Sequence, residues 1–151
     1  MERRSIYTLG TGLRSAEDFI EILLAYEIMS VIDVRSFPRS RIPHFSQLSL
    51  SDLLKSNSIT YHFLGKELGG HRKGGYAVYV STEEFSQGVG MIESIAEQAV
   101  SALICSEKFP WKCHRKWISR ELRRRGWGVE HIIDKGKVWK PQSTGAVFRC
   151  L

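Results

Sequence analysis

The sequence has few cysteine residues, three among 151, and none of them form a CxxC pair. This excludes a disulfide-rich secreted framework and indicates a reduced, intracellular setting. Long apolar runs are also absent, because no stretch approaches the ~20 residues that a helix needs to cross a bilayer. The opening segment, MERRSIYTLG, lacks the apolar run and the cleavage site of a signal peptide. We therefore expect no membrane partner and a cytoplasmic location.

Acidic residues are in the minority. The chain has 16 Asp and Glu residues against 22 Lys and Arg residues, which gives a net charge of +6 and an isoelectric point near 9.4. Such a balance favours anionic partners, either an anionic small molecule or nucleic acid, although a merely basic surface gives the same count. The hydrophobic content of 42% is that of an ordinary globular domain with a core.

Short apolar runs alternate with segments of helical periodicity. We expect strands at 5–10, 31–34, 59–63, 102–105 and 129–133. Ser15 and either Ser81 or Thr82 are suitable N-caps for helices between these strands. The alternation predicts a single-domain α/β protein with a mostly parallel, five-stranded sheet and helices on both faces. We expect residues 1–133 to form this domain, and residues 134–151 to be a C-terminal tail that either packs on the domain, for example over a sheet edge, or is partly mobile.

Arginine and glycine are concentrated in the loops that follow the expected strands, GTGLR, RSFPRSR, GKELGGHRKGG and SEKFPWKCHR. The carboxyl ends of parallel strands meet at one edge of a sheet, so these loops are expected to share one site. In the last of them a strand ends at Cys105 and a basic helix starts near Cys113. A helix N-terminus attracts anions, which places an anion site here.

Cys113 is the strongest candidate for chemistry. A thiol at a helix N-terminus beside cationic side chains can have its pKa lowered from about 8.5 to ~3.5–7.5, and His114 could act as a local base. The alternative is a buried packing cysteine, which is the favoured interpretation for Cys105 at the end of its strand. Glu107 is either a general acid or base, or an ion-pair partner of Arg115.

Two arginines from different loops, Arg35 and Arg115, could hold a phosphate or carboxylate between them through bidentate hydrogen bonds. The alternative for Arg35 is a structural pair with Asp33, two residues earlier in the chain. His44, His62 and His131 have no partner that the sequence reveals, and no function is assigned to them.

A metal site is the weakest of the candidate sites. Thiolate and imidazole groups suit zinc, and Cys105, Cys113 and His114 offer both. Their spacing matches none of the common structural zinc patterns. We therefore expect neither a metal nor a cofactor.

Four stretches, YTLG, DVRSFPRS, YHFLGKELGG and LICSEKFPWKCHR, resemble in this order the domain of unknown function 488 family. The resemblance covers residues 5–133. It implies a compact cytoplasmic α/β protein whose biochemical function is not established. It directs attention to Asp33, Arg35, Pro38, Ser40, Gly69, Gly70, Cys105, Glu107, Cys113, His114 and Arg115. One departure is that Thr11 follows Gly10, where members of the family often have histidine.

Together these observations give a first hypothesis, an enzyme acting on a phosphate-bearing or other anionic substrate. Its catalytic residues would be Cys113, His114 and Glu107. Its substrate-binding residues would be Arg35, Ser40, Gly69, Gly70, Cys105 and Arg115.

A second hypothesis is a non-catalytic module that binds nucleic acid or a nucleotide. The expected helix continues as Arg120, Arg123, Arg124 and Arg125, with Trp111 and Trp117 nearby, and such a surface can meet a phosphate backbone. Charged helix faces are more often simply solvated, and arginine at a helix C-terminus is favourable for the dipole alone. A third hypothesis is an interaction protein with no small-ligand site, in which the four loops do not converge.

Overall fold

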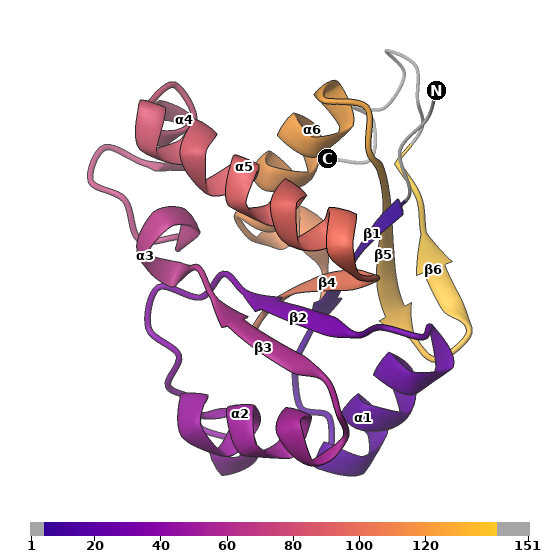
Figure 1. Ribbon diagram of the computed structural model, residues 1–151. Helices are drawn as coiled ribbons and strands as arrows, with labels where there is room; N and C mark the ends of the chain where they lie inside the picture. The colour runs from indigo at the N-terminus through magenta and orange to yellow at the C-terminus, as the bar shows by residue number, and fades with distance from the viewer. Residues whose placement is uncertain (1–4, 142–151) are drawn as a thin grey trace.

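The structure, a computed structural model, describes residues 5–141 of the chain. It contains one sheet with the strand order β3-β2-β4-β1-β5-β6 (Figure 1). The first five strands pair in parallel, and β6 pairs antiparallel to β5. The strands are β1 (Ser5–Gly10), β2 (Ser30–Asp33), β3 (Thr60–Phe63), β4 (Ser101–Cys105), β5 (Gly128–Asp134) and β6 (Lys137–Trp139).

Helices cover both faces of the sheet, as the alternating sequence pattern predicts (Figure 1). They are α1 (Ala16–Ala25), α2 (Gln47–Ser56), α3 (Gly65–Leu68), α4 (Tyr76–Tyr79), α5 (Glu83–Gln98) and α6 (Arg115–Arg124). Two 3-10 turns, η1 (Pro43–Phe45) and η2 (Pro110–Lys112), precede α2 and α6. None of the helices within residues 5–141 has the length and apolar character needed to span a membrane.

Two apolar clusters form the core, one on each face of the sheet. Ile32 and Leu103 contribute to the cluster under α3 to α6, whereas Val31 and Ala102 contribute to the cluster over α1 and α2. Successive strand residues point to opposite faces, and β2 and β4 are buried on both sides. Their apolar residues are therefore consecutive in the sequence rather than alternating, and Ser30, Asp33 and Ser101 are the buried polar exceptions.

The ends of the longer helices follow local capping chemistry. Ser15 is the N-cap of α1, where its hydroxyl accepts a hydrogen bond of 3.0 Å from the Asp18 N–H. Thr82 caps α5 in the same way toward the N–H of Phe85. Gly126, at a φ of 98°, follows the end of α6 in a backbone conformation that glycine adopts at no steric cost.

The structure corrects the sequence-based expectations in three places. The sheet has six strands rather than five, because residues 137–139 of the predicted tail form β6. The glycine-rich segment after β3 was expected to be a loop but contains the short helices α3 and α4. The basic helix begins at Arg115 rather than near Cys113. The rest of the tail, residues 142–151, lies outside the described residues and includes Cys150.

The connections leave β1 and β4 toward opposite faces of the sheet. β1 continues through α1 to β2, whereas its neighbour β4 continues through α6 to β5 on the other face (Figure 1). In open α/β sheets such a reversal opens a crevice outside the carboxyl ends of the strands, and ligands bind there. The topology therefore places a candidate site beside the ends of β1, β4 and β2.

Candidate functional site

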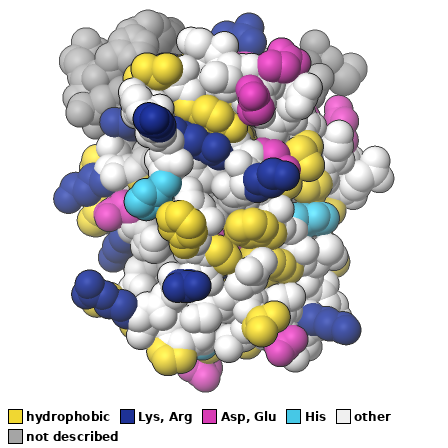
Figure 2. Space-filling view, turned by 90° about the vertical axis from the view of Figure 1, so that its left-hand side faces the viewer, with side chains coloured by type: hydrophobic (Ala, Val, Ile, Leu, Met, Phe, Trp, Pro, Cys, Tyr) yellow, Lys and Arg dark blue, Asp and Glu magenta, His cyan; other side chains and the backbone are white. Residues whose placement is uncertain are grey.

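A pocket of about 470 Å³ lies at the carboxyl ends of β2 and β4. It is lined by residues 35–37, 70, 71, 76, 105–107, 112–114, 116 and 117. The loops after β2, β3 and β4, three of the four predicted ones, therefore converge on this pocket. The interaction-protein hypothesis predicts no such convergence. Figure 2 faces the side at which β2 and β3 end, and lysine and arginine side chains are spread there around a central group of hydrophobic ones.

Cys113 lies between η2 and α6, partly exposed, and lines the pocket. Its sulfur accepts hydrogen bonds from the Arg115 Nε at 3.1 Å and from the Arg115 backbone N–H at 3.4 Å. The helix begins two residues later than expected, yet its first N–H still points at the thiol. The hydrogen bond from the Cys105 thiol, together with the nearby Arg115 charge, lowers the pKa of Cys113 to about 5.

Cys105 ends β4 and is only 6% exposed. Its sulfur, the sulfur of Cys113 and a ring nitrogen of His114 all lie within 4.8 Å of one another. The hydrogen bond to Cys113 and burial raise the pKa of Cys105. The opposite directions of the two pKa shifts favour a thiolate on Cys113 beside a protonated Cys105. The packing interpretation of Cys105 is incomplete, because this side chain also supplies the hydrogen bond.

Arg115 is fully buried, at 0% exposure, and its side chain donates to the Cys113 sulfur rather than facing an open ligand site. Its Nη1 donates to the Thr8 hydroxyl at 3.1 Å, and its Nη2 donates to the Glu107 carbonyl. Thr8 in turn contacts Nδ1 of His131 at 2.6 Å. Burial lowers the pKa of His131 to about 3, so this imidazole is neutral near pH 7. These contacts fix the guanidinium behind the thiol.

His114 is the N-cap residue of α6 and borders the same pocket. Its Nε2 lies 2.7 Å from the Val34 carbonyl oxygen, which can only accept, so Nε2 carries the proton and Nδ1 is free to accept one. Burial lowers the pKa of His114 and keeps the ring neutral near pH 7. A Cβ on Gly70 would lie 2.8 Å from Nδ1, which explains the glycine at this position.

Arg35 does not form one half of an open clamp. Its Nε and Nη2 bind the two carboxylate oxygens of Asp33 at 2.9 and 2.8 Å, and its Nη1 binds the Phe45 carbonyl at 2.8 Å. The Asp33 pair, which the sequence left as an alternative, is therefore the observed one. The guanidinium is 4% exposed and borders the pocket from behind this ion pair.

The remaining predicted residues are distributed around the pocket. Glu107 lines it, and contacts Arg115 through its main-chain carbonyl rather than through an ion pair. Gly69 packs against Ser36, whose hydroxyl would lie 2.2 Å from a Cβ at that position. Ser40 is not among the lining residues and instead accepts a hydrogen bond from the Ile42 N–H in the following turn.

Several residues line the pocket but were not predicted as site residues, namely Ser36, Phe37, His71, Tyr76 and Ser106. Ser36 and Ser106 adjoin residues that were predicted, and sequence proximity was the signal available for them. Tyr76 lies six residues beyond Gly70, and its ring packs on His114 at a centroid distance of 5.3 Å. No local pattern marks such a contact, because it depends on how the glycine-rich segment folds over the pocket.

A metal ion could be held by Cys105, Cys113 and His114, whose donor atoms are close enough together. Zinc binds thiolates, so an ion here would have to displace the proton of Cys105, whose pKa is raised by the hydrogen bond to Cys113 and by burial. It would also lie near the buried guanidinium of Arg115, which already contacts the Cys113 sulfur.

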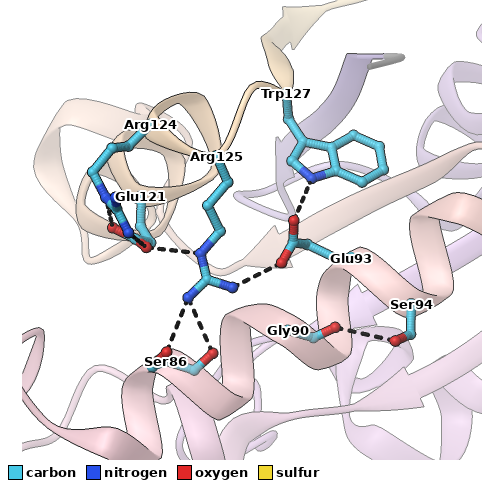
Figure 3. Close-up of polar contacts among 8 residues, drawn as sticks. All are labelled: Ser86, Gly90, Glu93, Ser94, Glu121, Arg124, Arg125 and Trp127. Carbon is cyan, nitrogen blue, oxygen red and sulfur yellow. Dashed lines mark hydrogen bonds and ion pairs between the residues drawn. The ribbon is translucent and has the colours of Figure 1, made fainter. Parts of the chain in front are cut away.

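The arginine-rich end of α6 is tied to α5 (Figure 3). Arg125 binds Glu93 at 2.7 Å and Glu121 at 2.7 Å, and Arg124 binds Glu121 at 2.6 Å. Trp127 Nε1 also donates to Glu93. Two of the four arginines proposed for a nucleic-acid backbone, Arg124 and Arg125, therefore already have carboxylate partners, which weakens that hypothesis.

We expect Glu121→Gln to lower the free energy of unfolding by about 1–2 kcal/mol near neutral pH, after allowance for solvent screening. The hydrogen bonds from Arg124 and Arg125 lower the pKa of Glu121 to about 2. A depressed carboxyl pKa contributes stability that is complete above about 4.3, the unfolded value, and is lost as the pH falls through the folded value. Urea unfolding of both proteins across this range should show the difference disappearing.

The matched control is Asp52→Asn, an exposed carboxylate on α2 with no ion pair among the described residues. The free energy of unfolding of this variant should stay within about 0.5 kcal/mol of the parent value at every pH. A stability difference between Glu121→Gln and the parent that does not change with pH would contradict the ion-pair assignment.

The model of one protein family, Domain of unknown function DUF488, matches residues 15–122. The match covers more than half of the chain, from the cap of α1 into α6, and includes Cys105, Cys113 and His114. No curated protein and no solved structure matches the chain. A thiol pair, a buried arginine and a neutral histidine thus meet at the carboxyl edge of an α/β sheet whose sequence belongs to the DUF488 family of domains of unknown function.

Proposed function

We propose that the protein is a cytoplasmic, thiol-dependent enzyme in which the Cys113 thiolate attacks an anionic substrate. The observation that carries this proposal is the environment of Arg115. The guanidinium is fully buried, and its contacts among the described residues are a hydroxyl, a carbonyl and the Cys113 sulfur, with no carboxylate. Buried charges are normally paired, so the thiolate is the counter-charge that this arginine requires.

Substrate binding is supported by the cations at the pocket. Lys112 and Lys116 line it, whereas Glu107 is the one carboxylate among its lining residues. Ammonium groups on flexible stems bind phosphate or carboxylate groups as point charges. We assign Lys112 and Lys116 to substrate attraction in place of a clamp made by Arg35 and Arg115, because both arginines have internal partners.

His114 is suited to the step that releases a covalent intermediate. Its neutral ring has an acceptor at Nδ1, so it can take a proton from an incoming water molecule or alcohol. The Cys113 thiolate needs no base, since its proton is already lost near neutral pH. In this proposal Cys113 is the nucleophile and His114 transfers the proton.

The rate of iodoacetamide labelling against pH, read at each cysteine by mass spectrometry, tests the proposal. We expect an inflection near pH 5 for Cys113 and little labelling of Cys105. At pH 6 the thiolate fraction would be about 300-fold above that of an ordinary thiol with a pKa of ~8.5. A thiolate of lower basicity is less nucleophilic, which leaves a net advantage of roughly tenfold.

Phosphate or sulfate should slow the labelling of Cys113 by binding beside Lys112 and Lys116. The control is Lys55→Gln, on α2 and away from the pocket, which should leave both the rate and the anion effect unchanged. If Cys113 titrates at or above about 8.5, it is an ordinary thiol, and the enzyme proposal is wrong. A binding module would then be the better interpretation.

A further inference from the structure

The two cysteines of the pocket differ in exposure although their sulfurs lie within 4.8 Å of each other. Both cysteines line the pocket, but Cys113 is partly exposed whereas Cys105 is 6% exposed and held at the end of β4. A reactive thiol that reaches solvent, with a less accessible second thiol beside it, fits a peroxidatic and a resolving cysteine. A nucleophile needs one thiol, so the second thiol of this pair suggests an additional reaction between the two sulfurs.

We propose that Cys113 and Cys105 form a reversible disulfide when a hydroperoxide enters the pocket, and that this disulfide switches the site off. The inference rests on the proposed function only in that both use the Cys113 thiolate. Hydrogen peroxide and small organic hydroperoxides are neutral and fit easily in a pocket of about 470 Å³.

The backbone leaves Cys113 the freedom that closure requires. A disulfide brings two sulfurs to about 2.05 Å, so one side chain must approach the other. Cys105 is fixed by its place in the central strand β4, where its carbonyl accepts from the Thr11 N–H at 2.8 Å. The N–H of Cys113, by contrast, donates across a longer 3.4 Å to the Pro110 carbonyl at the end of η2. The movement is therefore assigned to Cys113.

The chemistry balances in two steps. In the first, the Cys113 thiolate attacks one peroxide oxygen, an S–O bond forms and the O–O bond breaks. The sulfur is oxidised to a sulfenic acid, and the peroxide is reduced to hydroxide or alkoxide, which takes a proton from solvent. In the second, the Cys105 sulfur attacks the Cys113 sulfur, the S–S bond forms and the S–O bond breaks. The released hydroxide takes the Cys105 proton and leaves as water.

Electrostatics impose the order of these steps. While Cys113 is a thiolate, its charge and its hydrogen bond hold the proton on Cys105. Oxidation of Cys113 to the neutral sulfenic acid removes that charge, and Arg115 then favours ionisation of Cys105 instead. The resolving thiol thus becomes nucleophilic only after the first oxidation.

The test uses the full chain with Cys150→Ser, so that Cys105 and Cys113 are the remaining cysteines. The protein is reduced, freed of reductant and treated with a small excess of hydrogen peroxide. We expect the intact mass to fall by two hydrogens and the labelling of Cys113 by iodoacetamide to fall at least tenfold. Dithiothreitol should restore both. A peptide linking Cys105 to Cys113 identifies the bond.

The matched variant is Cys105→Ser, which keeps a hydrogen-bond donor beside Cys113 but has no resolving sulfur. Peroxide should now leave a sulfenic acid on Cys113 that dimedone traps, with further oxidation to the sulfinic acid. Metal content is measured on the same samples. One tightly held zinc ion per chain would overturn the proposal in favour of a metal site, and so would equal dimedone trapping with and without Cys105.

The result is separable from the proposed function. Rapid labelling of Cys113 at low pH without disulfide formation would contradict the disulfide proposal but support the thiol-enzyme proposal. Disulfide formation with an ordinary pKa at Cys113 would support the disulfide proposal but contradict the thiol-enzyme proposal.

Discussion

Replacing Arg35 by methionine should lower the free energy of unfolding by about 3–5 kcal/mol. The substitution removes the cation beside the Asp33 carboxylate, which is 0% exposed and is held by Arg35 at 2.8 and 2.9 Å. Tyr61 still donates to the same carboxylate at 2.6 Å, and so does the backbone N–H of residue 35 at 3.1 Å, but two neutral donors do not neutralise a buried charge. Urea unfolding, with the midpoint and slope compared between variant and parent, measures the loss.

Arg124→Met is the matched control. Arg124 also pairs with a carboxylate, Glu121, at 2.6 Å, yet its side chain is 71% exposed. Solvent screens exposed ion pairs, so the loss at Arg124 should be several-fold smaller than the loss at Arg35. The double variant Asp33→Asn with Arg35→Met removes both buried charges and should cost less than the two single losses combined. Similar losses for Arg35→Met and Arg124→Met would indicate that Arg35 is free to bind a ligand.

Replacing Arg115 by methionine should raise the pKa of Cys113 by more than 2 units. The variant loses the nearby charge and the Nε hydrogen bond of 3.1 Å, while the burial that raises a thiol pKa remains. At pH 6 the thiolate fraction should fall at least tenfold, and labelling of Cys113 should follow the higher pKa of the variant. The ultraviolet absorbance of the thiolate against pH provides an independent measurement of the same pKa.

Arg115 is also a packing element, so a second pair of variants tests the same electrostatics with less risk to folding. Cys105→Ala removes the thiol that hydrogen-bonds Cys113 and should raise the Cys113 pKa by about 1–2 units. Cys105→Ser restores a donor and should keep the pKa near 5. Equal pKa values in the alanine and serine variants would show that the hydrogen bond from Cys105 does not stabilise the thiolate.

The fold was largely predictable because it rests on local and periodic signals. The apolar runs of β2 and β4, the cap at Ser15 and the alternation of strands with helices are all visible within short windows of sequence. β6 was missed because it has three residues and gains its pairing only from β5 after the turn at Gly136. So short a segment carries no readable period.

The sequence by itself determined which kinds of side chain reach the carboxyl edge of the sheet. The chain order of strands and loops places Cys105, Cys113, His114 and two arginines there. Only the tertiary structure decided which partner each of these side chains binds and therefore which role it can take. Arg115 binds Thr8 from 107 residues away, and His114 binds the Val34 carbonyl from 80 residues away. Burial makes each of these contacts obligatory, since a buried polar group without a partner is costly, and burial is a property of the packed chain.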